Sequence, residues 1–354
     1  MNASIGAATR GSGHLSLTAS RFASAPRLAN SLRSTRIDTT SARKFRHHGV
    51  VQLPDSVRRR IEERAEEIGF AALKHAAEAL SAGYRGLEAA YLPANERIAA
   101  YLVTRMPSTY AAARRVLQEI NFEIGSVLDL GSGTGASALA AHERFPSATI
   151  TMFDRDAAML DAAREWLPDA AARVENFARL AVLPEADLVI ASYSLGETGA
   201  DWTRLWRAAR QALVIIEPGA TVGFALIRKI RDDLLAKGAR MIAPCPAESP
   251  CPIADPDWCH FAARVERSSL HRRVKGGDLG YEDEKFSYVI LGRDPVGQAH
   301  ARIIRRLRHE PGLITLQLCT PAGLEKTEVR KRNREQFRQA RHADWGDRWP
   351  SPGG

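Results

Sequence analysis

The apolar positions between residues 54 and 120 recur at the spacing of amphipathic helices. Asp55 is a candidate N-cap for a first helical run, which is expected to end near Gly83. A second run follows Asn95, and Pro107 is expected to break or kink it, because proline lacks the amide hydrogen that a helix interior requires. This part of the pattern predicts a helical module over residues 54–120.

Short apolar runs alternate with helical runs in the next part of the chain, which begins at Ser126. The predicted strands are Ser126–Leu130, Ala148–Asp154, Arg173–Phe177, Ala186–Tyr193 and Leu213–Glu217. The predicted helices are Ala136–Arg144, Ala157–Leu167, Thr203–Ala212 and Thr221–Gly238. Such alternation is typical of an α/β fold, in which helices cover both faces of a parallel sheet.

Two later apolar runs, Phe286–Leu291 and Leu313–Leu318, raise the number of predicted strands to seven. The predicted sheet domain therefore covers residues 121–239 and 281–320. Between its fifth and sixth strands, residues 240–280 are expected to form a cysteine-rich insertion.

The two ends of the chain lack this periodicity. Residues 1–50 are rich in Ser, Ala, Thr and Arg, which predicts a disordered N-terminal extension. An organellar targeting peptide has the same composition, but the bias towards Ala and Arg persists throughout the chain and favours a plain extension. Residues 321–354 are predicted to form a basic C-terminal tail.

Composition and charge exclude several classes of protein. The chain has 354 residues, and its longest apolar run, around Leu213–Ile216, has only the length of a strand, so no membrane-spanning segment is expected. Four cysteines without a secretory signal argue against a disulfide scaffold. Residues 1–50 carry +7 of the formal net charge of +9, so any basic surface on the remainder must be local.

A glycine-rich loop is the strongest local motif. Its glycines, Gly131, Gly133 and Gly135, directly follow the first predicted strand and precede a predicted helix. Glycines allow a sharp turn and the close approach of a ligand, and open α/β sheets bind ligands at the carboxyl ends of their strands. The spacing is G-x-G-x-G, whereas dinucleotide enzymes have G-x-G-x-x-G. The loop resembles motif I of class I methyltransferases, which bind S-adenosylmethionine.

Acidic residues near this loop support the same cofactor. Asp129 precedes the glycines, and a carboxylate there suits the sulfonium and ammonium groups of S-adenosylmethionine better than it suits a diphosphate. Asp154 ends the second predicted strand, where it is placed to accept hydrogen bonds from ribose hydroxyls. Tyr193 and Glu197 could shape the pocket, although core packing and a helix start explain them equally well. The predicted cofactor-binding residues are Asp129, Gly131, Gly133, Gly135, Asp154 and Tyr193.

The catalytic residues of a methyltransferase are not identified by the sequence. No Asn/Asp-Pro-Pro-aromatic motif for amino-group methylation follows the fourth predicted strand, and no cysteine lies near the loop to act as a covalent nucleophile. Methyl transfer to an already nucleophilic atom can need little more than alignment. The sequence therefore predicts a cofactor pocket and leaves open whether methyl transfer occurs.

The four cysteines indicate a metal site. Cys245, Cys251 and Cys259 have the spacing C-x5-C-x7-C in a proline-rich segment, and Cys319 ends a predicted strand. Structural zinc sites usually pair cysteines at C-x2–4-C, which neither short spacing matches, whereas iron–sulfur clusters tolerate looser spacing. Zinc, a cluster and unligated thiols all remain open on spacing alone. His260 is a candidate substitute ligand, although a packed histidine is the simpler interpretation.

From about Arg85 to Trp349 the chain resembles the methyltransferase-like family associated with assembly of the mitochondrial small ribosomal subunit, and its bacterial homologues. The stretches that carry the resemblance are Asp257–Phe261, Leu270–Arg272, Lys275–Gly277, Gly280–Tyr288, Leu318–Thr320 and Ala340–Asp347. The resemblance implies a Rossmann-like class I methyltransferase fold and a [4Fe–4S] cluster on Cys245, Cys251, Cys259 and Cys319. Ala247 departs from the family, whose members often have a histidine there.

Basic residues in the C-terminal region bear on the partner. Residues 302–348 contain twelve Lys or Arg and six acidic residues, and a second basic group lies over residues 264–275. Such residues contact phosphates without reading sequence, and Phe337, Trp345 and Trp349 could stack on bases or pin the tail. A solvated basic helix is the alternative. With the resemblance, small-subunit rRNA is the expected partner.

The interpretation as a whole is an S-adenosylmethionine-binding, cluster-containing methyltransferase-like protein of small-subunit assembly. A non-catalytic rRNA-binding assembly factor and a zinc-stabilised small-molecule methyltransferase are its alternatives. We expect a monomer without DNA or membrane partners, in the bacterial cytoplasm, with the mitochondrial matrix as the alternative location.

Overall fold

The computed structural model of the chain describes residues 49–84, 92–297 and 299–350. The extension predicted over residues 1–50 lies almost entirely outside these ranges. Within them, no helix is long and apolar enough to cross a bilayer.

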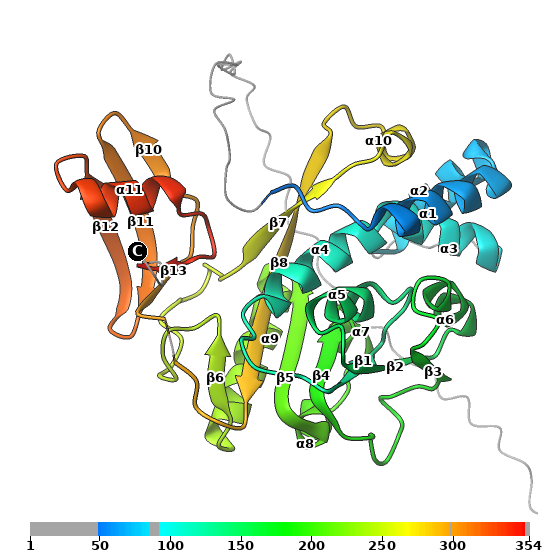
Figure 1. Cartoon of the computed structure of the whole chain (residues 1–354), viewed down its shortest axis with the longest axis horizontal. Coiled ribbons are helices and arrows are strands. Elements are labelled where there is room, and N and C mark those ends of the chain that lie inside the picture. The colour runs from blue at the N-terminus through cyan, green and yellow to red at the C-terminus, as the bar shows by residue number, and fades with distance from the viewer. Residues whose placement is uncertain (1–48, 85–91, 298, 351–354) are drawn as a thin grey trace, which may run out of the picture. The chain divides into compact units, whose positions relative to one another are not determined.

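Among the described residues, four helices occupy the region of the predicted helical module: α1 (Asp55–Ile68), α2 (Phe70–Tyr84), α3 (Ala94–Thr104) and α4 (Met106–Leu117) (Figure 1). The first predicted run is divided at Gly69, whose φ of 81° ends α1, because a positive φ interrupts the helix and glycine adopts it without strain. The expected break at Pro107 is confirmed. Arg105 separates α3 from α4, and Pro107 lies in the first turn of α4, where no amide hydrogen is needed.

The larger sheet has eight strands. They are β1 (Ser126–Leu130), β2 (Thr149–Asp154), β3 (Ala171–Val174), β4 (Ala186–Ser192), β5 (Ala209–Pro218), β6 (Arg240–Ala243), β7 (Phe261–Glu266) and β8 (Tyr281–Gly292). Their order is β3-β2-β1-β4-β5-β8-β6, with β7 paired to β8. β1 to β5 are parallel, and β8 is antiparallel to both β5 and β6. This is the strand arrangement of class I methyltransferases, which confirms the predicted fold class.

Helices cover both faces of this sheet. α4, α5 (Ala136–Arg144) and α6 (Ala157–Arg164) pack on one face, and α8 (Trp202–Ala208) and α9 (Thr221–Ala236) pack on the other. The short helix α7 (Leu195–Thr198) follows β4. Strand alternation separates the two cores: in β5, Val214 and Ile216 belong to the first core, whereas Leu213 and Ile215 belong to the second.

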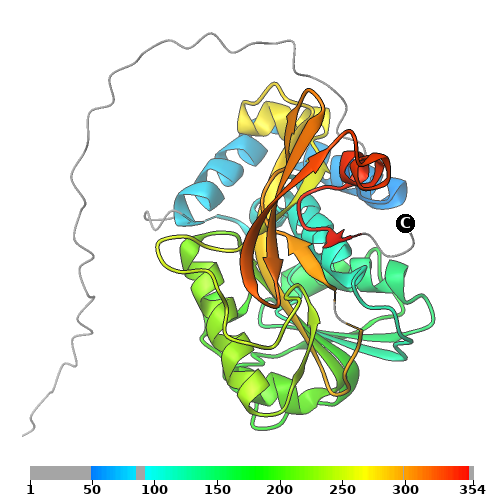
Figure 2. The ribbon, with the colours of Figure 1, turned by 90° about the vertical axis from the view of Figure 1, so that its left-hand side faces the viewer.

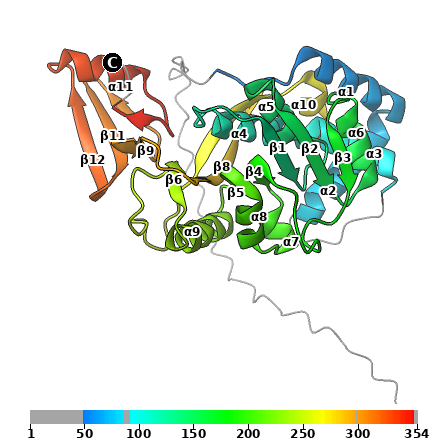
Figure 3. The same cartoon turned by 60° about the horizontal axis from the view of Figure 1, so that its bottom comes forward.

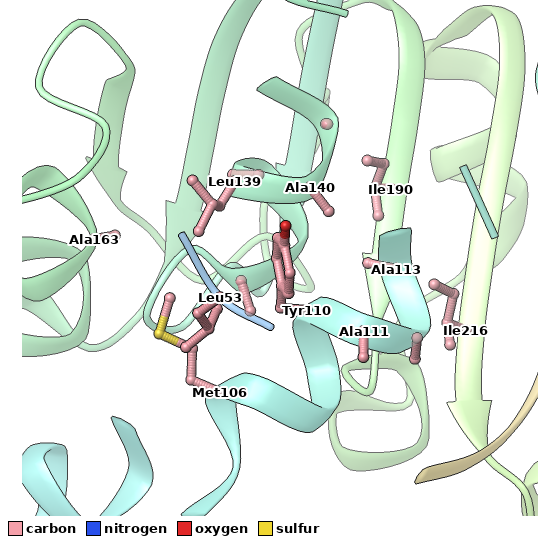
Figure 4. Close-up of a cluster of buried hydrophobic side chains, with 14 of the residues drawn as sticks. Leu53, Met106, Tyr110, Ala111, Ala113, Leu139, Ala140, Ala163, Ile190 and Ile216 are labelled. Atoms are coloured by element: carbon pink, nitrogen blue, oxygen red, sulfur yellow. The ribbon is translucent and has the colours of Figure 1, made fainter. Parts of the chain in front are cut away.

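The first core joins the helical module to the sheet. In Figure 4, Tyr110 of α4 points towards Leu139 and Ala140 of α5, with Ile190 of β4 nearby. The Tyr110 hydroxyl donates a hydrogen bond to Glu143 at the end of α5. The module is therefore packed against the sheet domain as part of one continuous core.

One predicted helix is too long. The sequence predicts a helix over Thr203–Ala212, but α8 ends at Ala208 and Ala209 already pairs with Ala186 of β4. The residues from Ala209 to Ala212 are drawn into β5 because a central strand gains hydrogen bonds from neighbours on both sides, and local helical propensity does not outweigh them.

A second sheet contains the last predicted strand. Its strands are β9 (Ala301–Ile303), β10 (Arg308–Glu310), β11 (Leu313–Thr320), β12 (Gly323–Arg330) and β13 (Arg348–Trp349). Leu313–Leu318, predicted as the seventh strand of the larger sheet, lies in β11, so that assignment is wrong. The strand pairs with β12 over eight residue pairs, and such a local hairpin forms more readily than a distant pairing.

The region predicted as a basic tail is folded. After β12, helix α11 (Arg334–His342) packs on β11 and β12, and β13 pairs with β9 (Figure 2). Ile314, Leu316, Val329 and Ala340 form a separate small core between them. Figures 1 and 3 show this second sheet beyond the β6 edge of the larger sheet.

A buried ion pair connects the second sheet to the helical module. The Arg302 side chain, on β9, is 2% exposed and donates to both carboxylate oxygens of Glu119, which follows α4, at 2.7 and 3.2 Å. Arg348 of β13 donates to the same carboxylate at 3.0 Å. Because of these guanidinium groups, the pKa of Glu119 is lowered although burial opposes ionisation.

Glu119→Ala leaves the Arg302 cation buried without its carboxylate. We expect the free energy of unfolding to fall by about 3–5 kcal/mol, measured by urea denaturation. Glu328→Ala is the control, since it breaks an exposed pair with Arg330 and is expected to cost less than about 1 kcal/mol. Equal effects of the two substitutions would contradict the structural role of the Glu119 pair.

Candidate functional site

A pocket of about 520 Å³ lies at the carboxyl ends of β1, β2 and β4, and we call it the strand-end pocket. Four of the six predicted cofactor residues line it: Gly131, Gly133, Asp154 and Tyr193. Parallel strands bring their carboxyl ends to one edge of a sheet, and the helical module covers that edge with residues of α3 and α4.

The glycine loop is tied to the end of β2. The Gly131 and Ser132 amides donate to the Phe153 carbonyl at 2.8 and 3.0 Å, and the Gly133 amide donates to Asp154 Oδ2 at 2.8 Å. Gly131 has a φ of 76°, and a Cβ atom there would lie 2.6 Å from Cβ of Ser194. Only glycine allows the loop and the residues after β4 to approach this closely.

Gly135 serves packing in this structure. It begins α5 with a φ of 75°, and a Cβ atom there would lie 2.9 Å from Cβ of Ala163 on α6. It does not line the strand-end pocket. Its position is explained by the close approach of the two helices.

Asp129 also lies outside the pocket lining, although the sequence analysis places it with the cofactor residues. Strand alternation turns its side chain away from that of Leu130, and it is 1% exposed. Burial raises the pKa of Asp129 to about 7. The Asp129 carboxylate therefore lies beneath the glycine loop. The alternation of side chains along β1 sets its orientation, and the charge of a ligand does not.

Tyr193 is held in an unusual position at the pocket wall. It is the only non-glycine residue in the described ranges with a φ in the left-handed region, at 54°. Its hydroxyl donates to Glu284 Oε1 of β8 at 2.9 Å, and burial raises the pKa of Tyr193 well above its ordinary value. Left-handed backbone at a bulky residue persists only where its surroundings hold it.

Acidic side chains beyond the six predicted cofactor residues also shape the pocket, and Glu197, which the sequence suggested as a pocket residue, is among them. Glu217, at the end of β5, accepts hydrogen bonds from the Leu195 and Gly196 amides, both at 3.1 Å. Burial raises the pKa of Glu217 to about 7 and that of Glu197 above its usual range. Glu284 lies in the stretch Gly280–Tyr288 that carries the family resemblance, but its contact with Tyr193 was not predicted, because only the antiparallel insertion of β8 brings the two together.

The pocket lining combines both charges. Its acidic residues are Asp154, Asp156, Glu175, Glu197 and Glu217, and its basic residues are Arg97, Arg105 and Arg155. Arg97 pairs with Asp156 at 2.6 Å, which ties α3 to the N-terminus of α6. A ligand that carries a positive charge and several hydroxyl groups suits this arrangement, since carboxylates accept hydrogen bonds from both.

A second cavity, of about 50 Å³, lies where α9, the segment after β6 and the second sheet meet, and we call it the cysteine cavity. All four predicted metal-site residues line it: Cys245, Cys251, Cys259 and Cys319. Cys319 reaches it because β11 pairs with β9, whose Arg302 lies opposite Cys319. The four thiols are free and half-buried.

The thiols are close enough to affect one another. Burial, and then the neighbouring thiols, raise the pKa of Cys259 well above its ordinary value and that of Cys319 to about 12. Without a metal these thiols are therefore neutral at pH 7. Among the described residues, no group of three or more His, Cys, Asp or Glu side chains is arranged to hold a metal ion.

The chemistry of the cavity nevertheless fits a thiolate-bound metal group. Buried guanidinium groups, those of Arg231 and Arg302, line it together with the thiols, and both lower the pKa of Cys245 against the larger effect of burial. Metal binding deprotonates thiols, and the cations would offset the resulting negative charge.

The aromatic residues near the cavity are packed. His260 stacks on Trp258 at 5.3 Å between ring centroids and meets Trp345 edge-on at 4.8 Å, which supports the simpler interpretation of His260. Trp349 is 7% exposed in the small core of the second sheet, where Phe337 also packs. Trp345 packs against the first core, and Phe337 and Trp349 pack within the second sheet, which supports the interpretation that these residues pin the C-terminal region.

Comparison with known proteins places the chain in a family. Residues 95–350 match the family described as mitochondrial small ribosomal subunit Rsm22. The chain belongs to the Rsm22 family. Within it, the chain is 31% identical over 287 residues to the human ribosome assembly protein METTL17, mitochondrial, an alignment that covers 71% of this chain and 62% of that protein.

More distant matches follow. An Rsm22-cox11 tandem protein of Schizosaccharomyces pombe, also mitochondrial, is 25% identical over 327 residues, which cover 73% of this chain and 43% of the yeast protein. The chain thus spans less than two thirds of the length of either relative. Among solved structures, the plantazolicin methyltransferase BpumL covers 67% of this chain with 9% identity and a TM-score of 0.38.

Proposed function

We propose that this Rsm22-family chain acts in assembly of the small ribosomal subunit, where it contacts rRNA, binds S-adenosylmethionine and holds a [4Fe–4S] cluster. The observation that carries the proposal is the family match over residues 95–350, since the family description and the name of the human relative both concern the ribosome. The curated relatives are named as mitochondrial, so we place the chain in the mitochondrion in preference to the bacterial cytoplasm expected from sequence.

S-adenosylmethionine would occupy the strand-end pocket. Gly131 and Gly133 would let the cofactor approach the backbone, and the second lone pairs of the Asp154 carboxylate would accept the ribose hydroxyls. The acidic lining would face the positive end of the cofactor. When bound, the cofactor supplies an electrophilic methyl group, and the chain's own residues would hold and orient the acceptor.

The cluster would be held in the cysteine cavity. A single zinc ion requires all four sulfurs about 2.3 Å from one centre, whereas each thiolate of a [4Fe–4S] cluster binds a different iron. The four cysteines line one cavity, and their spacing of C-x5-C-x7-C favours the cluster over zinc, which usually takes cysteines paired at C-x2–4-C. Its role would be structural, because it would join the segment after β6 to the second sheet.

Exposed cations on the second sheet supply a surface for rRNA. They lie on β12, α11 and the turn between them: Lys326, Arg330, Lys331, Arg332, Arg334, Arg338 and Arg341. Since the nearby aromatic residues are packed, contact would be made through phosphates, which gives affinity without sequence readout.

Asp154→Asn is expected to weaken S-adenosylmethionine binding by about 10- to 100-fold in isothermal titration, because the amide no longer provides charged acceptors for the ribose. Asp169→Asn, an exposed acid outside the pocket, is the control. An unchanged affinity in Asp154→Asn would place the cofactor elsewhere.

Transfer of a tritiated methyl group to small-subunit RNA distinguishes an enzyme from the non-catalytic alternative. That alternative predicts binding and RNA protection without transfer of the label.

Protein purified without oxygen is expected to absorb visible light and to contain about four iron and four sulfide per chain. Cys319→Ser should lose most of both, because it removes one of four ligands, whereas Thr315→Ser on the same strand should not. Metal and sulfide analysis, together with a visible absorption spectrum, measures these quantities. Colourless protein with one zinc per chain would support the zinc alternative.

Reversing Lys331, Arg332 and Arg334 to Glu is expected to weaken binding to small-subunit RNA and to flatten its salt dependence, by about two in the slope of log K against log salt. Fluorescence anisotropy over a range of salt concentrations measures both. Reversing three exposed cations on helices, Arg59, Lys74 and Lys229, is the matched control. The same loss in both variants would argue for non-specific attraction only.

A further inference from the structure

Two buried arginines border the cysteine cavity, and their hydrogen bonds reach the backbone on either side of the cysteines. Arg231 of α9 is 4% exposed and Arg302 of β9 is 2% exposed. A guanidinium group is always charged and is expensive to bury unless it is paired and hydrogen-bonded. Their burial beside four thiols therefore calls for an explanation.

Arg231 holds the loop between the first two cysteines. One terminal nitrogen of its guanidinium group donates to the Ala247 carbonyl at 3.0 Å and to the Ser249 carbonyl at 2.6 Å. Both carbonyls lie between Cys245 and Cys251, so one planar group fixes the backbone that separates these two sulfurs.

Arg302 fixes the first cysteine relative to the fourth. Its backbone lies opposite Cys319 in the pairing of β9 with β11. Its side chain donates to the Pro244 carbonyl, immediately before Cys245, at 2.9 Å, and to the Gly346 carbonyl at 2.9 Å. A single residue thus connects the two parts of the chain that supply cysteines 74 positions apart.

The charges of the two arginines are balanced differently. Arg302 has the buried carboxylate of Glu119 as its partner. Arg231 forms an ion pair with Asp232, whose side chain is 51% exposed, and the Nε of Arg231 has no hydrogen-bond partner among the described residues. A buried cation with a solvent-screened partner favours an anion in the cavity beside it.

We propose that Arg231 and Arg302 are positioning residues of the cysteine site: Arg302 sets the distance from Cys245 to Cys319, and Arg231 shapes the Cys245–Cys251 loop and offsets the negative charge of a thiolate-bound cluster. The inference rests on the proposed function, since it requires a cluster in the cavity. A cluster with four thiolates carries net negative charge, which increases on reduction, so a nearby cation stabilises the reduced form more than the oxidised form.

The test compares Arg231→Met and Arg231→Lys in the full chain purified without oxygen. Arg231→Met removes the charge and both hydrogen bonds, so we expect less than half of the wild-type iron and sulfide and, in the cluster that remains, a more negative reduction potential. Arg231→Lys keeps the charge but lacks the planar fork, so we expect lower iron content at a potential close to that of the wild type. Lys237→Met, which removes an exposed cation just after the same helix, should change neither.

Iron and sulfide analysis and a redox titration followed by electron paramagnetic resonance provide the readouts, and circular dichroism establishes that each variant is folded. Should Arg231→Met not fold, the lysine variant still separates geometry from charge through its iron content. Wild-type iron content and potential in both Arg231 variants would overturn this inference while leaving the cluster in place. Wild-type protein without iron would overturn the proposed cluster itself, and this inference with it.

Discussion

The buried pair between Arg302 and Glu119 is the interaction on which the rest of the molecule depends. Arg302 belongs to the second sheet, Glu119 follows the last helix of the N-terminal module, and the same guanidinium group reaches the carbonyl before Cys245. Three regions that are far apart in the chain are thus joined by the guanidinium group of Arg302. Because an unpaired charge in such a place costs several kcal/mol, the second sheet can lie only where Arg302 finds its carboxylate, and that location is also where Cys319 meets the other cysteines.

The antiparallel strand β8 is a second constraint with consequences for both sites. Its C-terminal half pairs with β5 and β6, and its N-terminal half pairs with β7. The strand carries Glu284, which accepts the hydrogen bond of the Tyr193 hydroxyl, and Ser287, whose hydroxyl donates to the Cys259 carbonyl. One strand therefore holds Tyr193, a residue of the pocket wall, and also the backbone at Cys259, a residue of the cysteine cavity.

The two sites differ in how they are built. The strand-end pocket is large, about 520 Å³, and is lined by acidic and basic side chains from the ends of parallel strands and from the helical module. The cysteine cavity is small, about 50 Å³, and it is assembled from a loop, a helix and strands of both sheets. The first arrangement suits a larger polar ligand, and the second suits a compact group that joins the parts around it.

The sequence by itself determined what depends on neighbouring residues. Helical and strand periods located β1, β2, β4 and β5, the spacing of Gly131 and Gly133 located the pocket, and Pro107 marked a helix boundary. The third strand was predicted at Arg173–Phe177 but lies at Ala171–Val174. The tertiary structure decided the features that depend on contacts between distant residues. Whether Leu313–Leu318 joins one sheet or the other depends on its partner strand and not on its own pattern. Glu284 and Arg302 gained their roles only through pairings with residues far away in the chain, which no local pattern encodes.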